Sequence, residues 1–75
     1  MLRDMELRVK SGELLSEALK RTRSQANLSQ VDLAIRLGVS YRAIQYWEAG
    51  QVPQPRHRRA IQDFLDEYAD DGVAA

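Results

Sequence analysis

Four side chains able to hydrogen-bond nucleic-acid bases or phosphates recur at helical spacing in the middle of the chain: Tyr41, Arg42, Gln45 and Tyr46. An arginine can donate two hydrogen bonds to guanine O6 and N7, and a glutamine amide can pair similarly with adenine. A tyrosine can touch a thymine methyl group or bond a phosphate through its hydroxyl. Arg42 is the strongest candidate for a base contact. The plainer alternatives are that Arg42 contacts a phosphate or is a free surface arginine, that Gln45 contacts the phosphate backbone, and that Tyr46 packs partly beside the preceding helix.

Two short helices joined by a tight turn must position these side chains. The first is expected from Ser29, a predicted N-cap with Asp32 in a capping-box position, to about Leu37. Its apolar face is predicted at Val31, Leu33, Ala34 and Leu37. Gly38 supplies the turn, Ser40 can cap the second helix, and Gly50 ends it. With Val39, Ile44 and Trp47 directed inward, the segment is a helix-turn-helix, an arrangement that usually places its second helix in the DNA major groove.

Two further amphipathic segments flank this unit. Apolar spacing predicts a helix over 11–24, with Leu14, Leu15, Ala18 and Leu19 on its apolar face and Glu13 near its start. A last helix is expected from Pro55, with a stripe at Ile61, Phe64, Leu65 and Tyr68. The sequence therefore predicts a compact all-α domain over 11–70, followed by a disordered tail over 71–75. Residues 1–10 are expected to form an extension, either frayed or a strand that pairs with its copy in a dimer.

The charges are unevenly distributed although the formal net charge is zero. Between Lys20 and Arg59 eight basic residues stand against two acidic ones, whereas 60–75 holds five acidic residues and no basic one. A polyanion responds to the local patch, because screening weakens interactions beyond about 8–10 Å at ordinary salt. Arg56, His57 and Arg58 begin the last helix, where positive charge opposes the helix dipole. Phosphate contact explains these three residues better than a role in stability.

The sequence lacks the residues that several classes of function require. The chain has no cysteine and one histidine, His57, so neither a disulfide nor a zinc site is expected. No nucleophile–base pair and no phosphate-cradling glycine loop is present, and we expect neither enzymatic activity nor a cofactor. No apolar run approaches the roughly 20 residues of a membrane span, and no signal-peptide pattern opens the chain. We therefore expect a soluble cytoplasmic protein.

A set of residues spread over roughly 14–65 resembles the lambda-repressor/Cro-like family, also called the xenobiotic-response-element family. The matching positions are Arg23, Leu28-Ser29-Gln30, Leu33-Ala34, Leu37-Gly38-Val39-Ser40, Ile44, Glu48, Gly50 and Pro53. The resemblance implies a domain of four or five helices that binds DNA as a dimer on a palindrome. Trp47 stands where many members carry a smaller aliphatic residue, and too little chain follows Leu65 for the fifth helix that many members use to dimerise.

The resemblance also assigns roles to single residues. Gln30 and Ser29 correspond to positions that contact a DNA phosphate at the start of the first helix of the motif. Arg23 and Glu48 correspond to a structural ion pair that ties the helix over 11–24 to the end of the second helix of the motif. Residues 51–56 correspond to a loop that grips the DNA backbone.

The expected function is a sequence-specific transcriptional regulator of duplex DNA. Repression is favoured because so small a domain can occupy a site but has no room for an effector pocket. The resemblance and the size suggest a phage or mobile-element regulator, or an antitoxin, with a pseudo-palindromic operator, a homodimer and a protein partner such as a toxin or anti-repressor. The alternative is a protein-interaction module that keeps the fold without binding DNA.

Overall fold

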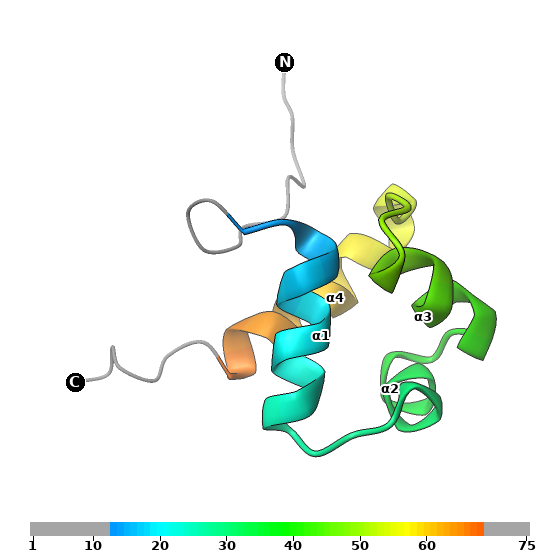
Figure 1. Ribbon diagram of the computed structural model, residues 1–75. Coiled ribbons are helices and arrows are strands. Elements are labelled where there is room, and N and C mark those ends of the chain that lie inside the picture. The colour runs from blue at the N-terminus through cyan, green and yellow to red at the C-terminus, as the bar shows by residue number, and fades with distance from the viewer. Residues whose placement is uncertain (1–12, 69–75) are drawn as a thin grey trace.

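The computed structural model describes residues 13–68, which form four helices (Figure 1). The helices are α1 (Leu15–Gln25), α2 (Gln30–Leu37), α3 (Tyr41–Glu48) and α4 (Pro55–Glu67). No strand occurs within 13–68, which confirms the all-α class. The predictions of an N-terminal extension over 1–10 and of a tail over 71–75 lie outside the described residues.

A single apolar core joins the four helices. Leu19 of α1, Leu33 of α2, Ile44 of α3 and Ile61 of α4 have no measurable exposure, and Phe64 is 1% exposed. Figure 1 shows α4 crossing behind α1, with the start of α4 lying close to α3 and the α2–α3 pair on one side of α1. Each helix contributes one face to the core, as the amphipathic spacing predicted. Tyr68, at the end of the α4 stripe, meets the Phe64 ring edge to face, with centroids 5.4 Å apart.

The first helix begins later than the sequence suggested. Leu14 is the N-cap, and its backbone N–H donates to the Glu17 carboxylate at 3.1 Å. Glu17, rather than Glu13, is therefore the acidic residue of the first turn, and Glu13 pairs with Arg21 at 2.9 Å. Leu14 lies outside the helix and is 64% exposed, so its predicted place on the apolar face was wrong.

The turn between α2 and α3 follows the prediction closely. Gly38 has a φ of 72°, in the left-handed region, and caps the end of α2. The Ser40 hydroxyl accepts a hydrogen bond from the Ala43 N–H at 3.1 Å and caps the start of α3. These two local devices fix where α2 ends and where α3 begins.

The outer face of α2 is more apolar than expected. Leu33 and Ala34 are buried and Leu37 is partly buried, but Val31 is 50% exposed and Ile35 is 74% exposed. Val31 and Ile35 are four residues apart and share the helix face opposite the core. The assignment of Val31 to the core face was therefore wrong.

A substitution at Gly38 should separate backbone strain from steric clash. A Cβ atom added there would meet no heavy atom within 4 Å, so the cost of Gly38→Ala is the left-handed conformation itself. We expect a loss of about 1 kcal/mol in the free energy of unfolding, measured by urea denaturation. Gly38→Asn is the matched control and should lose less, because asparagine tolerates this region. A Gly38→Ala protein as stable as wild type would contradict the assignment.

Candidate nucleic-acid interface

The outward face of α3 presents the four residues proposed for base contacts. Tyr41 is 46% exposed, Tyr46 is 51% exposed, and Arg42 and Gln45 are also exposed. Ile44 and Trp47, on the opposite face of the same helix, are buried. Tyr46 borders a cleft on the α4 side of α3.

Two of these outward side chains are hydrogen-bonded to each other. The Gln45 amide nitrogen donates to the Tyr41 hydroxyl oxygen at 3.1 Å, one helical turn apart. An amide group has two N–H donors and a carbonyl oxygen, so Gln45 keeps one donor and one acceptor for another partner. Those are the groups that a bidentate contact with adenine requires.

A buried carboxylate connects the other end of α3 to α1 and α2. Glu48 is 7% exposed, and its two oxygens accept from Arg23 Nε at 2.7 Å and Nη2 at 3.1 Å. Arg23 Nη1 also donates to the Leu28 carbonyl at 3.1 Å. The hydrogen bond to Glu48 raises the pKa of Arg23 above its ordinary value, against the opposing effect of partial burial. The geometry agrees with the predicted structural role of this pair.

Gln30 belongs to the same cluster. Its amide nitrogen donates to Glu48 Oε1 at 2.9 Å, so the side chain supports the ion pair as well as standing at the start of α2. A hollow of about 380 Å³ lies over this cluster and is bordered by Lys20, Arg23, Gln30, Gln45, Glu48 and Ala49. The second N–H of Gln30 stays available for a phosphate at the edge of this hollow.

Ser29 acts as a helix cap. Its hydroxyl accepts from the Asp32 N–H at 3.0 Å, and its own N–H donates to the Asp32 carboxylate at 3.0 Å. The backbone N–H of Ser29 is thus occupied, and only its hydroxyl hydrogen is left for a phosphate. The hydrogen bond from the Ser29 backbone N–H to the Asp32 carboxylate is the main cause that holds the pKa of Asp32 below its usual value. The stability that this bond contributes is therefore present at neutral pH and is lost as the pH falls through the lowered pKa of Asp32.

Folding neutralises much of the basic segment. Arg21 pairs with Glu13, Arg23 with Glu48, Arg36 with Glu67 and Arg59 with Asp63. Two of these partners come from α4, so the acidic stretch of the sequence compensates the basic one. Among the described residues, Lys20, Arg42 and Arg56 are cations without a carboxylate partner.

The three residues predicted for phosphate contact at the start of α4 differ in placement. Arg56 is exposed, and its Nε lies 3.3 Å from His57 Nε2. His57 is half-buried and packs on Trp47, with ring centroids 5.4 Å apart. Arg58 is also half-buried. Arg56 is the residue of the three best placed to meet a phosphate, and His57 has a packing role that its spacing did not indicate.

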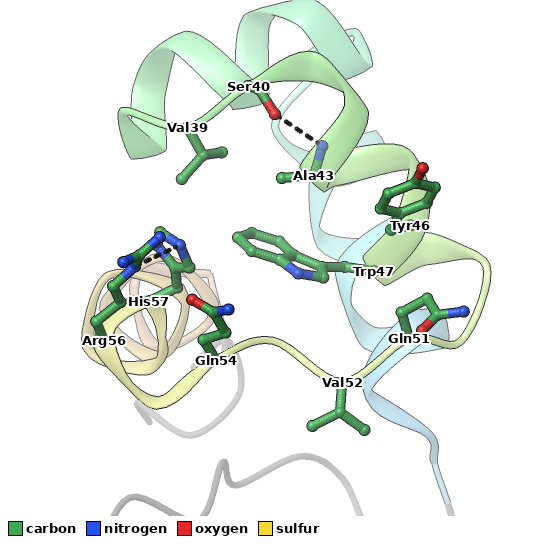
Figure 2. Close-up of a pocket in the computed structure, with 10 residues that line it drawn as sticks. All are labelled: Val39, Ser40, Ala43, Tyr46, Trp47, Gln51, Val52, Gln54, Arg56 and His57. Atoms are coloured by element: carbon green, nitrogen blue, oxygen red, sulfur yellow. Dashed lines mark hydrogen bonds between the residues drawn. The ribbon is translucent and has the colours of Figure 1, made fainter.

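A cleft of about 430 Å³ separates α3 from the start of α4 (Figure 2). It is bordered by Val39, Ser40, Ala43, Tyr46, Trp47, Gln51, Val52, Gln54, Arg56 and His57. Figure 2 shows the Trp47 ring reaching across from α3 toward His57, above the loop that carries Gln54.

Other kinds of site are not found in the part of the chain that the structure describes. Within 13–68 no three histidine, cysteine or acidic side chains gather where a metal ion could be held. No helix in this range combines the length and apolar character that crossing a bilayer requires.

The fold and the exposed face of α3 define a helix-turn-helix domain, in which the second helix of the motif is the one presented to DNA. Residues 14–73 match the family described as helix-turn-helix domain, and the chain belongs to that family. Neither a curated protein nor a solved structure gives a significant match.

Removal of the buried carboxylate should destabilise the domain strongly. Glu48→Ala leaves the Arg23 guanidinium, whose side chain is 21% exposed, without its charged partner. We expect a loss of about 3–5 kcal/mol in the free energy of unfolding, measured by urea denaturation. Asp63→Ala is the control: its pair with Arg59 spans 3.7 Å between side chains 70% and 79% exposed, and should cost under about 1 kcal/mol. Equal losses in the two variants would show that Glu48 is not a structural anchor.

Proposed function

We propose that this domain is a sequence-specific regulator of transcription that reads the major groove of duplex DNA with α3. The observation that carries the proposal is the outward face of α3, where Tyr41, Arg42, Gln45 and Tyr46 are exposed together on a helix fixed at both ends. An uncompensated arginine beside an amide with a free donor and acceptor provides the groups needed for guanine and adenine.

The surroundings of α3 support contact with both DNA strands. Gln30 and Lys20 border the hollow on the α1–α2 side of the helix, and Arg56 borders the cleft on the α4 side. A helix with its side chains is roughly 10–12 Å across, close to the roughly 12 Å width of the major groove. Groups that flank α3 are therefore placed to meet the two phosphate backbones, with Ser29 adding its hydroxyl.

Within the helix-turn-helix proteins, the lambda-repressor/Cro-like group is the one we propose for this chain. The ion pair of Arg23 and Glu48 joins α1 to the end of α3, as the resemblance implied. A homodimer on a pseudo-palindromic operator follows from that assignment, with recognition helices about 34 Å apart. We infer repression by occupancy of the operator, without catalysis, in a phage, mobile-element or antitoxin setting in the cytoplasm.

A second candidate is a module that binds a protein, such as a toxin or an anti-repressor. The exposed Val31 and Ile35 on α2 favour it, because adjacent apolar side chains in water are typical of contact surfaces. Binding at that face would tolerate salt, whereas DNA binding through α3 would weaken steeply as salt rises.

Selection from a pool of random duplexes tests the main proposal. The wild-type protein should enrich a palindrome, and Arg42→Ala should lose a preference for a G·C pair at one position of each half-site. The expected loss of discrimination is about 1–3 kcal/mol at that position, with other positions preserved. Enrichment of no sequence by the folded wild-type protein would refute specific DNA binding and favour the interaction module.

The salt dependence of binding tests the phosphate contact at α4. Arg56→Ala should reduce the slope of log affinity against log salt by about 1, because one fewer counterion is released. The loss should be similar for all duplex sequences. Arg59→Ala is the control, and should change the slope less because Asp63 already accompanies that charge. An unchanged slope in Arg56→Ala would remove Arg56 from the interface.

A further inference from the structure

Trp47 carries a hydrogen-bond donor that the fold does not use. The residue is 5% exposed, yet its indole N–H has no acceptor among residues 13–68. An indole nitrogen can only donate, and a buried tryptophan N–H usually has a partner. Among residues 13–68, every side-chain nitrogen or oxygen that is fully buried has a hydrogen-bond partner. Because the Trp47 N–H has none, its nitrogen is not fully buried and must reach the protein surface. Figure 2 shows the nitrogen-bearing edge of the ring facing the loop side of the cleft.

The cleft is continuous with the outward face of α3. Ser40, the N-cap of α3, and Tyr46, on its outward face, both border it. The opposite rim carries the Gln54 amide and the uncompensated guanidinium of Arg56. The cleft therefore has an apolar wall, a donor at the buried ring and a positive charge at its mouth, which together suit an anionic group.

We propose that Trp47 Nε1–H donates a hydrogen bond to a phosphate oxygen of the DNA backbone when α3 occupies the major groove. The inference rests on the proposed function. A helix fills most of the width of the groove, so the cleft along its flank meets the sugar–phosphate backbone rather than base edges.

Displacement of water from the cleft favours a phosphate as the partner of the indole N–H. While the cleft is open, water can accept from the indole N–H. A DNA strand that covers the cleft displaces this water, and the donor would then be left unsatisfied unless the strand supplies an acceptor. A phosphate oxygen supplies one, and its charge makes the hydrogen bond stronger than one to a neutral acceptor.

The contact can be located with duplexes that carry a neutral methylphosphonate at one backbone position at a time. The duplex is the sequence selected by the wild-type protein, and affinities of wild type and Trp47→Phe are compared at each position. We expect Trp47→Phe to bind the unmodified duplex about 10- to 100-fold more weakly. At one phosphate per half-site, the methylphosphonate should weaken wild type by a larger factor than it weakens Trp47→Phe. Equal factors at every phosphate would overturn the inference.

Two controls separate this contact from packing and from charge. Replacement of Trp47 by β-(3-benzothienyl)alanine keeps the ring shape and removes the donor, and should reproduce the loss even if Trp47→Phe folds poorly. Because the indole is neutral, neither variant should change the salt slope, in contrast to Arg56→Ala. Wild-type affinity in the benzothienyl protein would overturn the inference while leaving the proposed function intact. Failure of the wild-type protein to select any duplex would overturn both.

Discussion

The carboxylate of Glu48 is the constraint on which the rest of the arrangement depends. It accepts hydrogen bonds from Arg23 of α1 and Gln30 of α2, so one side chain of α3 fixes three helices relative to one another. Apolar packing around Leu33 and Ile44 tolerates small shifts and rotations, whereas a bidentate ion pair has a defined geometry. Replacing the pair by apolar residues could leave stability unchanged, but the apolar contact would not fix the orientation of α3 in the same way.

The distribution of charge follows from how the acidic end of the chain packs. Glu67 and Asp63 lie on α4 and pair with Arg36 and Arg59. Arg36 also lies over the Phe64 ring, and hydrogen bonding to Tyr68 raises its pKa above the ordinary value. The net charge of zero therefore does not describe the surface, where some cations are paired with carboxylates and others are not. Arg36 of α2 and Arg59 of α4 are compensated within the protein, whereas Arg42 of α3 and Arg56 at the start of α4 keep charges that a polyanion can meet.

The sequence was most informative where structure is decided locally. Ser29, Gly38 and Ser40 act on residues within four positions, so the bounds of α2 and α3 could be predicted from caps and a turn. The exposure of Val31 and the packing of His57 on Trp47 depend on which faces meet in three dimensions, and spacing along one helix does not contain that information. Gln30 is an intermediate case: its position was predicted, but its bond to Glu48 could be seen only once α2 and α3 were placed together.

The recognition helix is short, and its usefulness depends on being held at both ends. Ser40 fixes its first turn and Glu48 its last, so the outward side chains between them project from a backbone with little freedom to move. The bond from Gln45 to Tyr41 restricts two of these side chains further before any ligand arrives. Because ordering a long polar side chain at an interface costs roughly 0.5–1.5 kcal/mol, a face restricted in advance loses less on binding. Arg42 has no such hydrogen-bonded neighbour, so only a bound ligand can order its side chain. The specificity of the outward face of α3 therefore depends most on the hydrogen-bond acceptors that the ligand presents to Arg42.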